Sequence, residues 1–186
     1  MPEKRHPWPD LKASLRRLHE LHPEFLSKAI LVGGAACMFY RAVLARESHP
    51  EFPVNQDKDE SAWLSKDLDF THITREDIPQ DTSLPCGLVQ SGIRLSALDF
   101  AETVRTGVLE FDDGLQINIL VADPLELYRE KEACLARLNR PQDRLHLDLL
   151  KTYLKYELWQ ARQSKDPGLK IALEARYQNY AKELLL

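Results

Sequence analysis

The chain has 186 residues, a formal net charge of −4 at pH 7 and three cysteines. This length is typical of one domain, and a hydrophobic fraction of 44% is enough to form a core. The acidic balance excludes an overall basic field of the kind that coats nucleic acid, although local basic clusters remain compatible with RNA binding. The few cysteines, without metal-type spacing, favour a reduced cytoplasmic protein, and no apolar run approaches the roughly 18 residues of a membrane span.

The amino-terminal part is predicted to alternate helices with short strands. Leucines recur at helical intervals over 10–21, which indicates an amphipathic helix. Residues 28–34 follow as a short buried strand that ends in two glycines, and 35–46 as a second helix. The charged, proline-containing stretch 47–62 shows no period. We expect a loop there, either a lid over a substrate or surface disorder.

A further strand and a hairpin complete the predicted sheet. Residues 63–71 return to a strand pattern. Two strand-like runs, 103–111 and 115–121, flank Asp113-Gly114, a pair typical of a tight β-hairpin turn.

From Pro124 onward the chain has a helical pattern. The predicted helices cover 124–138, 143–163 and 169–185. The order of elements therefore predicts an α+β fold, with a small mixed β-sheet in 1–123 and a helical carboxyl-terminal subdomain in 124–186.

Two aspartates on the second strand are the strongest candidates for chemistry. Asp67 and Asp69 are separated by one residue, so their side chains project from the same face of a strand with Cα atoms roughly 6.6 Å apart. Two carboxylates at this spacing can share one divalent cation. Upstream, Gly33 and Gly34 open a helix, where backbone N–H groups can meet phosphate oxygens.

Each feature also has a structural interpretation. Glycines at a strand-to-helix turn often serve the backbone alone, and paired acids on an exposed strand are common. Their order and strand context together favour a nucleotide site. The histidines form no metal-ligand pair at helical spacing, and we expect them, His6 and His146 included, to lie at the surface.

The two motifs together resemble the nucleotidyltransferase superfamily, the DNA polymerase β-like fold. Its signature is a Gly-Gly or Gly-Ser turn, a helix, and a strand that bears Asp-x-Asp. Residues 31–36 (Leu-Val-Gly-Gly-Ala-Ala) and 65–70 (Ser-Lys-Asp-Leu-Asp-Phe) fit this signature. Arg41 lies on the intervening helix, where several members carry an arginine.

A third segment resembles one branch of that superfamily, the abortive-infection AbiEii toxins and their uncharacterised bacterial relatives. Its pattern is Lys-x-x-Ala-x-x-x-Arg, then Arg-Asp, then Asp. Lys131 and Arg137 begin the match, Arg140 and Asp143 continue it with two inserted residues, and Asp148 ends it. Without the resemblance, charges at these spacings would be read as solvated helix faces.

The resemblance implies a nucleoside triphosphate bound with Mg²⁺ or Mn²⁺, the metal held by Asp67 and Asp69. It also implies that Lys131 supplies positive charge to the nucleotide and that Asp143 orients it. The implied nucleotide-binding residues are Gly33, Gly34, Arg41, Lys66, Lys131 and Asp143.

The predicted catalytic set is Asp67, Asp69 and Asn118. Active members usually carry a third acid on a later strand, where this chain has Asn118, and an amide offers an oxygen but no negative charge. Two functions therefore stay open. One is transfer of a nucleotidyl group to an RNA, protein or small-molecule acceptor, with an antitoxin or other protein as partner. The alternative is a catalytically inactive module that binds a nucleotide or a protein, or that keeps only the fold.

Overall fold

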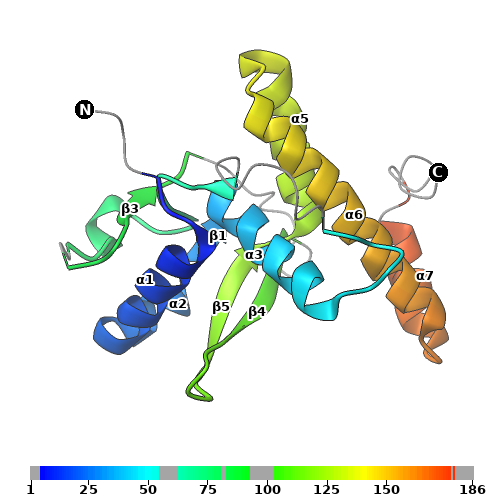
Figure 1. The fold of residues 1–186 in the computed structure, drawn as a ribbon, viewed down its shortest axis with the longest axis horizontal. Coiled ribbons are helices and arrows are strands. Elements are labelled where there is room, and N and C mark those ends of the chain that lie inside the picture. The colour runs from blue at the N-terminus through cyan, green and yellow to red at the C-terminus, as the bar shows by residue number, and fades with distance from the viewer. Residues whose placement is uncertain (1–4, 55–62, 81–82, 93–102, 177, 179–186) are drawn as a thin grey trace.

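The protein is an α+β structure in which helices pack around a mixed five-stranded sheet (Figure 1). The structure is a computed structural model, and it describes residues 5–54, 63–80, 83–92, 103–176 and 178. The helices are α1 (Trp8–Leu21), α2 (Pro23–Leu26), α3 (Gly33–Glu47), α5 (Pro124–Leu138), α6 (Pro141–Gln163) and α7 (Pro167–Arg176), with a 3-10 turn η2 (Arg75–Asp77). The strands are β1 (Ile30–Val32), β2 (Asp67–Thr71), β3 (Gly87–Gln90), β4 (Val104–Glu110) and β5 (Gln116–Ala122).

The sheet has the order β3-β2-β1-β5-β4. The central strand β1 is antiparallel to β2 and parallel to β5. Its last residue, Val32, pairs with Asp69, and α3 begins at the next residue. The register therefore brings the start of α3 directly beside the Asp-x-Asp strand.

The predicted hairpin is confirmed. β4 and β5 pair as antiparallel neighbours, and the Phe111 N–H donates to the Leu115 carbonyl at 2.9 Å. Gly114 has φ +84°, the left-handed conformation that a three-residue hairpin loop requires at this position.

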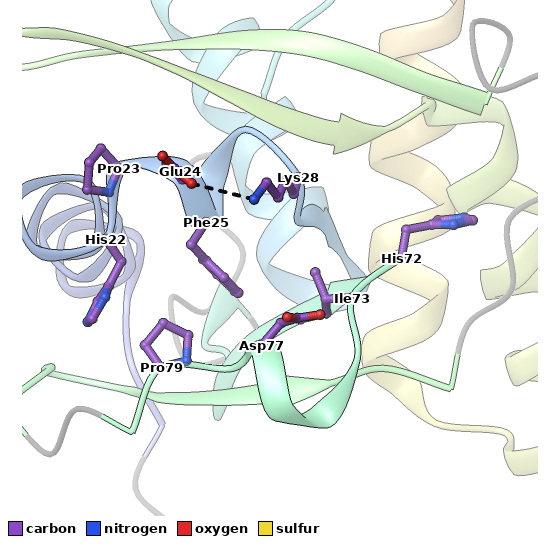
Figure 2. Close-up of a pocket in the computed structure, with 9 residues that line it drawn as sticks. All are labelled: His22, Pro23, Glu24, Phe25, Lys28, His72, Ile73, Asp77 and Pro79. Carbon is purple, nitrogen blue, oxygen red and sulfur yellow. Dashed lines mark ion pairs between the residues drawn. The ribbon is translucent and has the colours of Figure 1, made fainter.

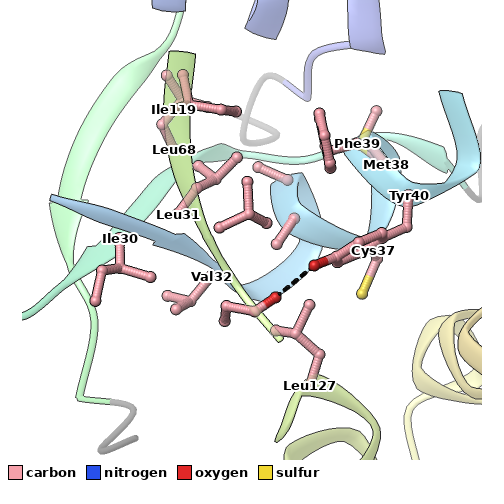
Figure 3. Close-up of a cluster of buried hydrophobic side chains, with 14 of the residues drawn as sticks. Ile30, Leu31, Val32, Cys37, Met38, Phe39, Tyr40, Leu68, Ile119 and Leu127 are labelled. Carbon is pink, nitrogen blue, oxygen red and sulfur yellow. Dashed lines mark hydrogen bonds between the residues drawn. The ribbon is translucent and has the colours of Figure 1, made fainter. Parts of the chain in front are cut away.

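One hydrophobic core joins the sheet to helices on both sides of the predicted boundary at 123/124. Figure 3 shows Leu31, Leu68 and Ile119 close to α3, and the buried Tyr40 hydroxyl donates to the Ala122 carbonyl at 2.8 Å. Leu150 of α6 belongs to the same cluster. Among the described residues, the helical part shares its core with the sheet.

The stretch predicted as a loop after α3 is anchored on α6. Phe52 packs against Tyr156 and Trp159, with ring centroids 5.6 and 6.0 Å apart. Residues 55–62, which carry the rest of the predicted loop, lie outside the described part of the chain, as do 179–186 of the last predicted helix. Of the helices described, none is both long enough and apolar enough to cross a membrane.

Candidate functional site

A cavity of about 420 Å³ opens where β1 ends and α3 begins. Seven of the residues that the sequence predicted for the site line it. They are Gly33, Gly34, Lys66, Asp67, Asp69, Lys131 and Asp143. Residues from α3, β2, α5 and α6 therefore meet in one hollow, although more than a hundred positions separate Gly33 from Asp143 in the sequence.

The glycine turn is built around the carboxylate of Asp69. Gly33 has φ +66°, and a Cβ placed on it would lie 2.6 Å from Oδ2 of Asp69. Any other residue would be strained in the backbone and would clash with the carboxylate. The close approach brings the first N–H groups of α3 and an acid to the same wall, which suits an anion bound together with a cation.

Asp67 and Asp69 point from the same face of β2, as predicted from their spacing. Burial, and then the neighbouring charge of Asp67, raises the pKa of Asp69 to about 6. A bound cation would relieve this repulsion and favour the ionised carboxylate.

The acids fit Mg²⁺ held jointly with a phosphate ligand. The described residues contain no group of three His, Cys, Asp or Glu side chains placed to hold a metal ion by themselves. Mg²⁺ in nucleotide sites is commonly bound through one or two carboxylates, with substrate phosphates and water completing the shell. Asp67 and Asp69 have the number and type of ligands that such a site takes from the protein.

Lys131 and Asp143 lie inside the structure, so the interpretation that places them on solvated helix faces is wrong. Lys131 is 5% exposed and Asp143 2%. The Lys131 ammonium lies 3.3 Å from Oε2 of Glu130 and 3.5 Å from Oδ1 of Asp143. Burial lowers the pKa of Lys131, but the neighbouring Cys37, Glu130 and Asp143 together raise it by more, so the side chain stays a cation.

Arg140 is a further cation at the rim of the cavity. Its Nε lies 2.8 Å from Oδ2 of Asp143, so Asp143 is shared between Lys131 and Arg140. Arg140 itself is about half exposed, with a relative side-chain area of 53%. Arg140 is thus more accessible to an incoming anion than Lys131.

His146 is a cavity residue that the sequence interpretation missed. It is 1% exposed rather than at the surface, and His6 is also buried, at 4%. Both are corrections to the predicted surface positions. His146 follows Asp143 by three residues on α6, and residues three apart share a helix face. That spacing is the feature of the sequence from which the position of His146 in the cavity could have been predicted.

Arg41 does not line the cavity but lies one layer behind it. Its guanidinium carbon sits 4.9 Å from the ring centroid of Trp63, and the Trp63 ring lies 5.5 Å from that of His146. Arg41 therefore supports the wall of the cavity through the rings of Trp63 and His146, which are tilted against each other.

Asn118 is not brought to the acid pair. The β1–β5 register pairs Leu31 with Val121, so its continuation sets Ala122 beside Val32, which pairs with Asp69 on its other side. Asn118 lies four residues further back along β5, about 13 Å away along the strand, and is exposed. The expectation that it takes the place of a third acid is not met, because pairing offset, rather than face alone, decides which residue reaches the site.

A separate cavity of about 500 Å³ lies next to α2, with Phe25, Ile73 and Pro79 around it (Figure 2). Its lysine, Lys28, is 3.6 Å from Glu24 in an exposed ion pair. None of the sequence-predicted site residues lines it. Although this cavity has the larger volume of the two, the one at Gly33 is the candidate site because the predicted residues line it.

Comparison of the chain with protein-family models, curated proteins and solved structures found no match. The functional assignment therefore depends on the geometry of the site.

Proposed function

We propose that the protein binds a nucleoside triphosphate with Mg²⁺ in the cavity at Gly33 and transfers a nucleotidyl group to a hydroxyl of an acceptor. The acceptor oxygen would bond to the α-phosphorus as the bond to the β-phosphate breaks, and pyrophosphate would leave. The observation that carries this proposal is the contact between Gly33, at the start of α3, and the carboxylate of Asp69. Phosphate binding at the helix and cation binding at the acid are thus coupled in space.

In this proposal, the role of each cavity residue follows from its charge. The N–H groups at the start of α3 would bind phosphate oxygens, and Lys131 and Arg140 would balance the remaining negative charge. Asp67 and Asp69 would hold Mg²⁺, which when bound neutralises charge that develops on the phosphate during transfer. Asp143 would position Lys131 by its ion pair.

A second function, nucleotide binding without transfer, is favoured by the residue at the position that a third acid would occupy. That residue is Ala122, and the carboxylate of the next residue, Asp123, already binds other groups of the protein. It accepts from the Leu125 N–H at 2.9 Å and pairs with Arg105 and Arg176, each at 2.7 Å. A base for the acceptor hydroxyl would have to come from elsewhere in the cavity.

A transfer assay distinguishes the two functions. The protein is incubated with each labelled nucleoside triphosphate, Mg²⁺ or Mn²⁺, and total RNA. Label transfer that is lost in Asp69→Ala and kept in Asn118→Ala supports the enzyme, because only Asp69 lies in the cavity. Triphosphate binding without transfer, to RNA or to protein, selects the second function. The resemblance to the toxin branch adds the proposal of a neutralising protein partner, which would suppress the transferred label when added.

A further inference from the structure

His146 is a buried polar side chain whose two ring nitrogens have no hydrogen-bond partner in the described part of the chain. A buried polar group without a partner costs roughly 1–3 kcal/mol, and such groups in folded proteins are uncommon. A hydrophobic residue of similar size would avoid that cost. The position therefore calls for a reason beyond packing.

The ring borders the cavity from the side of the phosphate-binding turn. A Cβ on Gly34 would lie 3.7 Å from Cε1 of His146, the ring carbon between the two nitrogens, so this part of the ring lies next to the start of α3. The other neighbours hold the ring in place. The Trp63 ring packs against it at a tilt of 44°, with 5.5 Å between centroids, and α6 carries His146 on the same face as Asp143.

The His146 ring is neutral at this position. Burial, and then the charge of Lys131, lowers the pKa of His146 to about 3. A neutral imidazole offers one N–H donor and one acceptor. It can donate to an anionic oxygen without adding a further positive charge to a cavity already lined by Lys66, Lys131 and Arg140.

Building on the proposed triphosphate site, we propose that His146 is a phosphate-positioning residue whose imidazole N–H donates to a phosphate oxygen bound at the start of α3. Both nitrogens are shielded from water, so the contact forms as neighbouring side chains give way to the ligand. Lys131 is the neighbour suited to this, because its ammonium is shared between Glu130 and Asp143 and can turn to the phosphates.

Calorimetric binding of inorganic triphosphate with Mg²⁺ tests the inference, because this probe carries phosphates and no base or sugar. We expect His146→Leu to weaken binding by about tenfold to a hundredfold, the usual range for a hydrogen bond to a charged group. His146→Gln, which keeps a donor, should recover most of that loss. Equal binding by wild type and His146→Leu would overturn the role of His146, and a loss seen only with nucleoside triphosphates would overturn the phosphate contact.

Two further readouts separate positioning from a structural role. His146→Leu should melt at the same or a higher temperature than wild type, because it removes a buried polar group without a partner. In wild type, addition of the triphosphate should shift the ¹⁵N resonances of the His146 ring, and unchanged resonances in a protein that binds would contradict the proposal. If wild type does not bind the probe at all, the proposed function fails, which is a different result from binding that ignores His146.

Discussion

At the scale of single residues, Gly33 combines a left-handed backbone with a very close neighbouring carboxylate. Its φ of +66° already costs an alanine about 1–2 kcal/mol, and the new Cβ would stand 2.6 Å from Oδ2 of Asp69. We expect Gly33→Ala to lower the free energy of unfolding by about 2 kcal/mol or more and to abolish triphosphate binding. Denaturant unfolding and calorimetry measure the two effects.

Gly34→Ala is the matched control for the stability effect. Gly34 does not have a positive φ, and its added Cβ would meet Ser65 Oγ at 3.3 Å, a contact that a small shift relieves. Its effect on unfolding should stay within about 1 kcal/mol. Equal destabilisation by both substitutions would show that the geometry at Gly33 and Asp69 is not as described.

His146 gives stability a pH dependence of predictable sign. Its pKa is about 3 in the folded protein, below that of an ordinary histidine, so between those values the unfolded chain binds more protons. Its contribution to stability is therefore fully present above pH 6.5 and is lost as the pH falls towards 3, with a slope of at most about 1.4 kcal/mol per pH unit. Unfolding curves of wild type and His146→Leu over this range should differ by that slope, and parallel curves would contradict a buried neutral imidazole.

At the scale of elements, Asp123 links the end of β5 to three other segments. Its 1%-exposed carboxylate caps α5 through the Leu125 N–H and pairs with Arg105 of β4 and Arg176 of α7. Removing one partner of a buried ion pair typically costs about 3–5 kcal/mol.

We predict that Asp123→Ala destabilises the protein by that order and releases α7 first, because no residue of α7 is buried. Hydrogen exchange should accelerate in α7 before the sheet opens. Asp113→Ala, which removes an exposed ion pair with Arg16, is the control and should cost at most about 1 kcal/mol. Similar losses in the two variants would argue against Asp123 as the link.

Most of the helices and strands could be predicted from the sequence. The strands around Asp67, the hairpin and the helices from Pro124 follow from local periodicity and turn residues, and the structure has them. The position of Asn118 depends on how β5 is offset against β1, which alternation along one strand does not determine. Local pattern thus predicted the right face of β5 but not which residue reaches the acids.

At the scale of the whole molecule, the cavity exists because the helical segment packs back on the sheet. Lys131 of α5 and Asp143 of α6 reach the acids of β2 only in the folded chain. Charge patterns alone favoured solvated helix faces for both residues, and burial was not visible in their spacing. Both residues were expected in the site from the motif resemblance rather than from periodicity, and both line the cavity.

Mg²⁺ and pH should act together on the folded protein. Because the pKa of Asp69 is raised to about 6, the carboxylate is ionised at pH 7.5 and mostly protonated at pH 5. We expect Mg²⁺ with inorganic triphosphate to raise the melting temperature at pH 7.5 and to do so much less at pH 5. Wild type and Asp69→Asn are compared by thermal melting. An equal shift at both pH values, or in both proteins, would contradict metal binding by Asp69.

The most direct test of the account is calorimetric titration of the protein with each nucleoside triphosphate in the presence of Mg²⁺. The geometry of Gly33, Asp69 and Lys131 predicts saturable binding of at least one triphosphate, lost in Asp69→Ala and kept in Asn118→Ala. Absence of binding to all of them, or binding that Asp69→Ala leaves unchanged, would contradict a nucleotide site in this cavity.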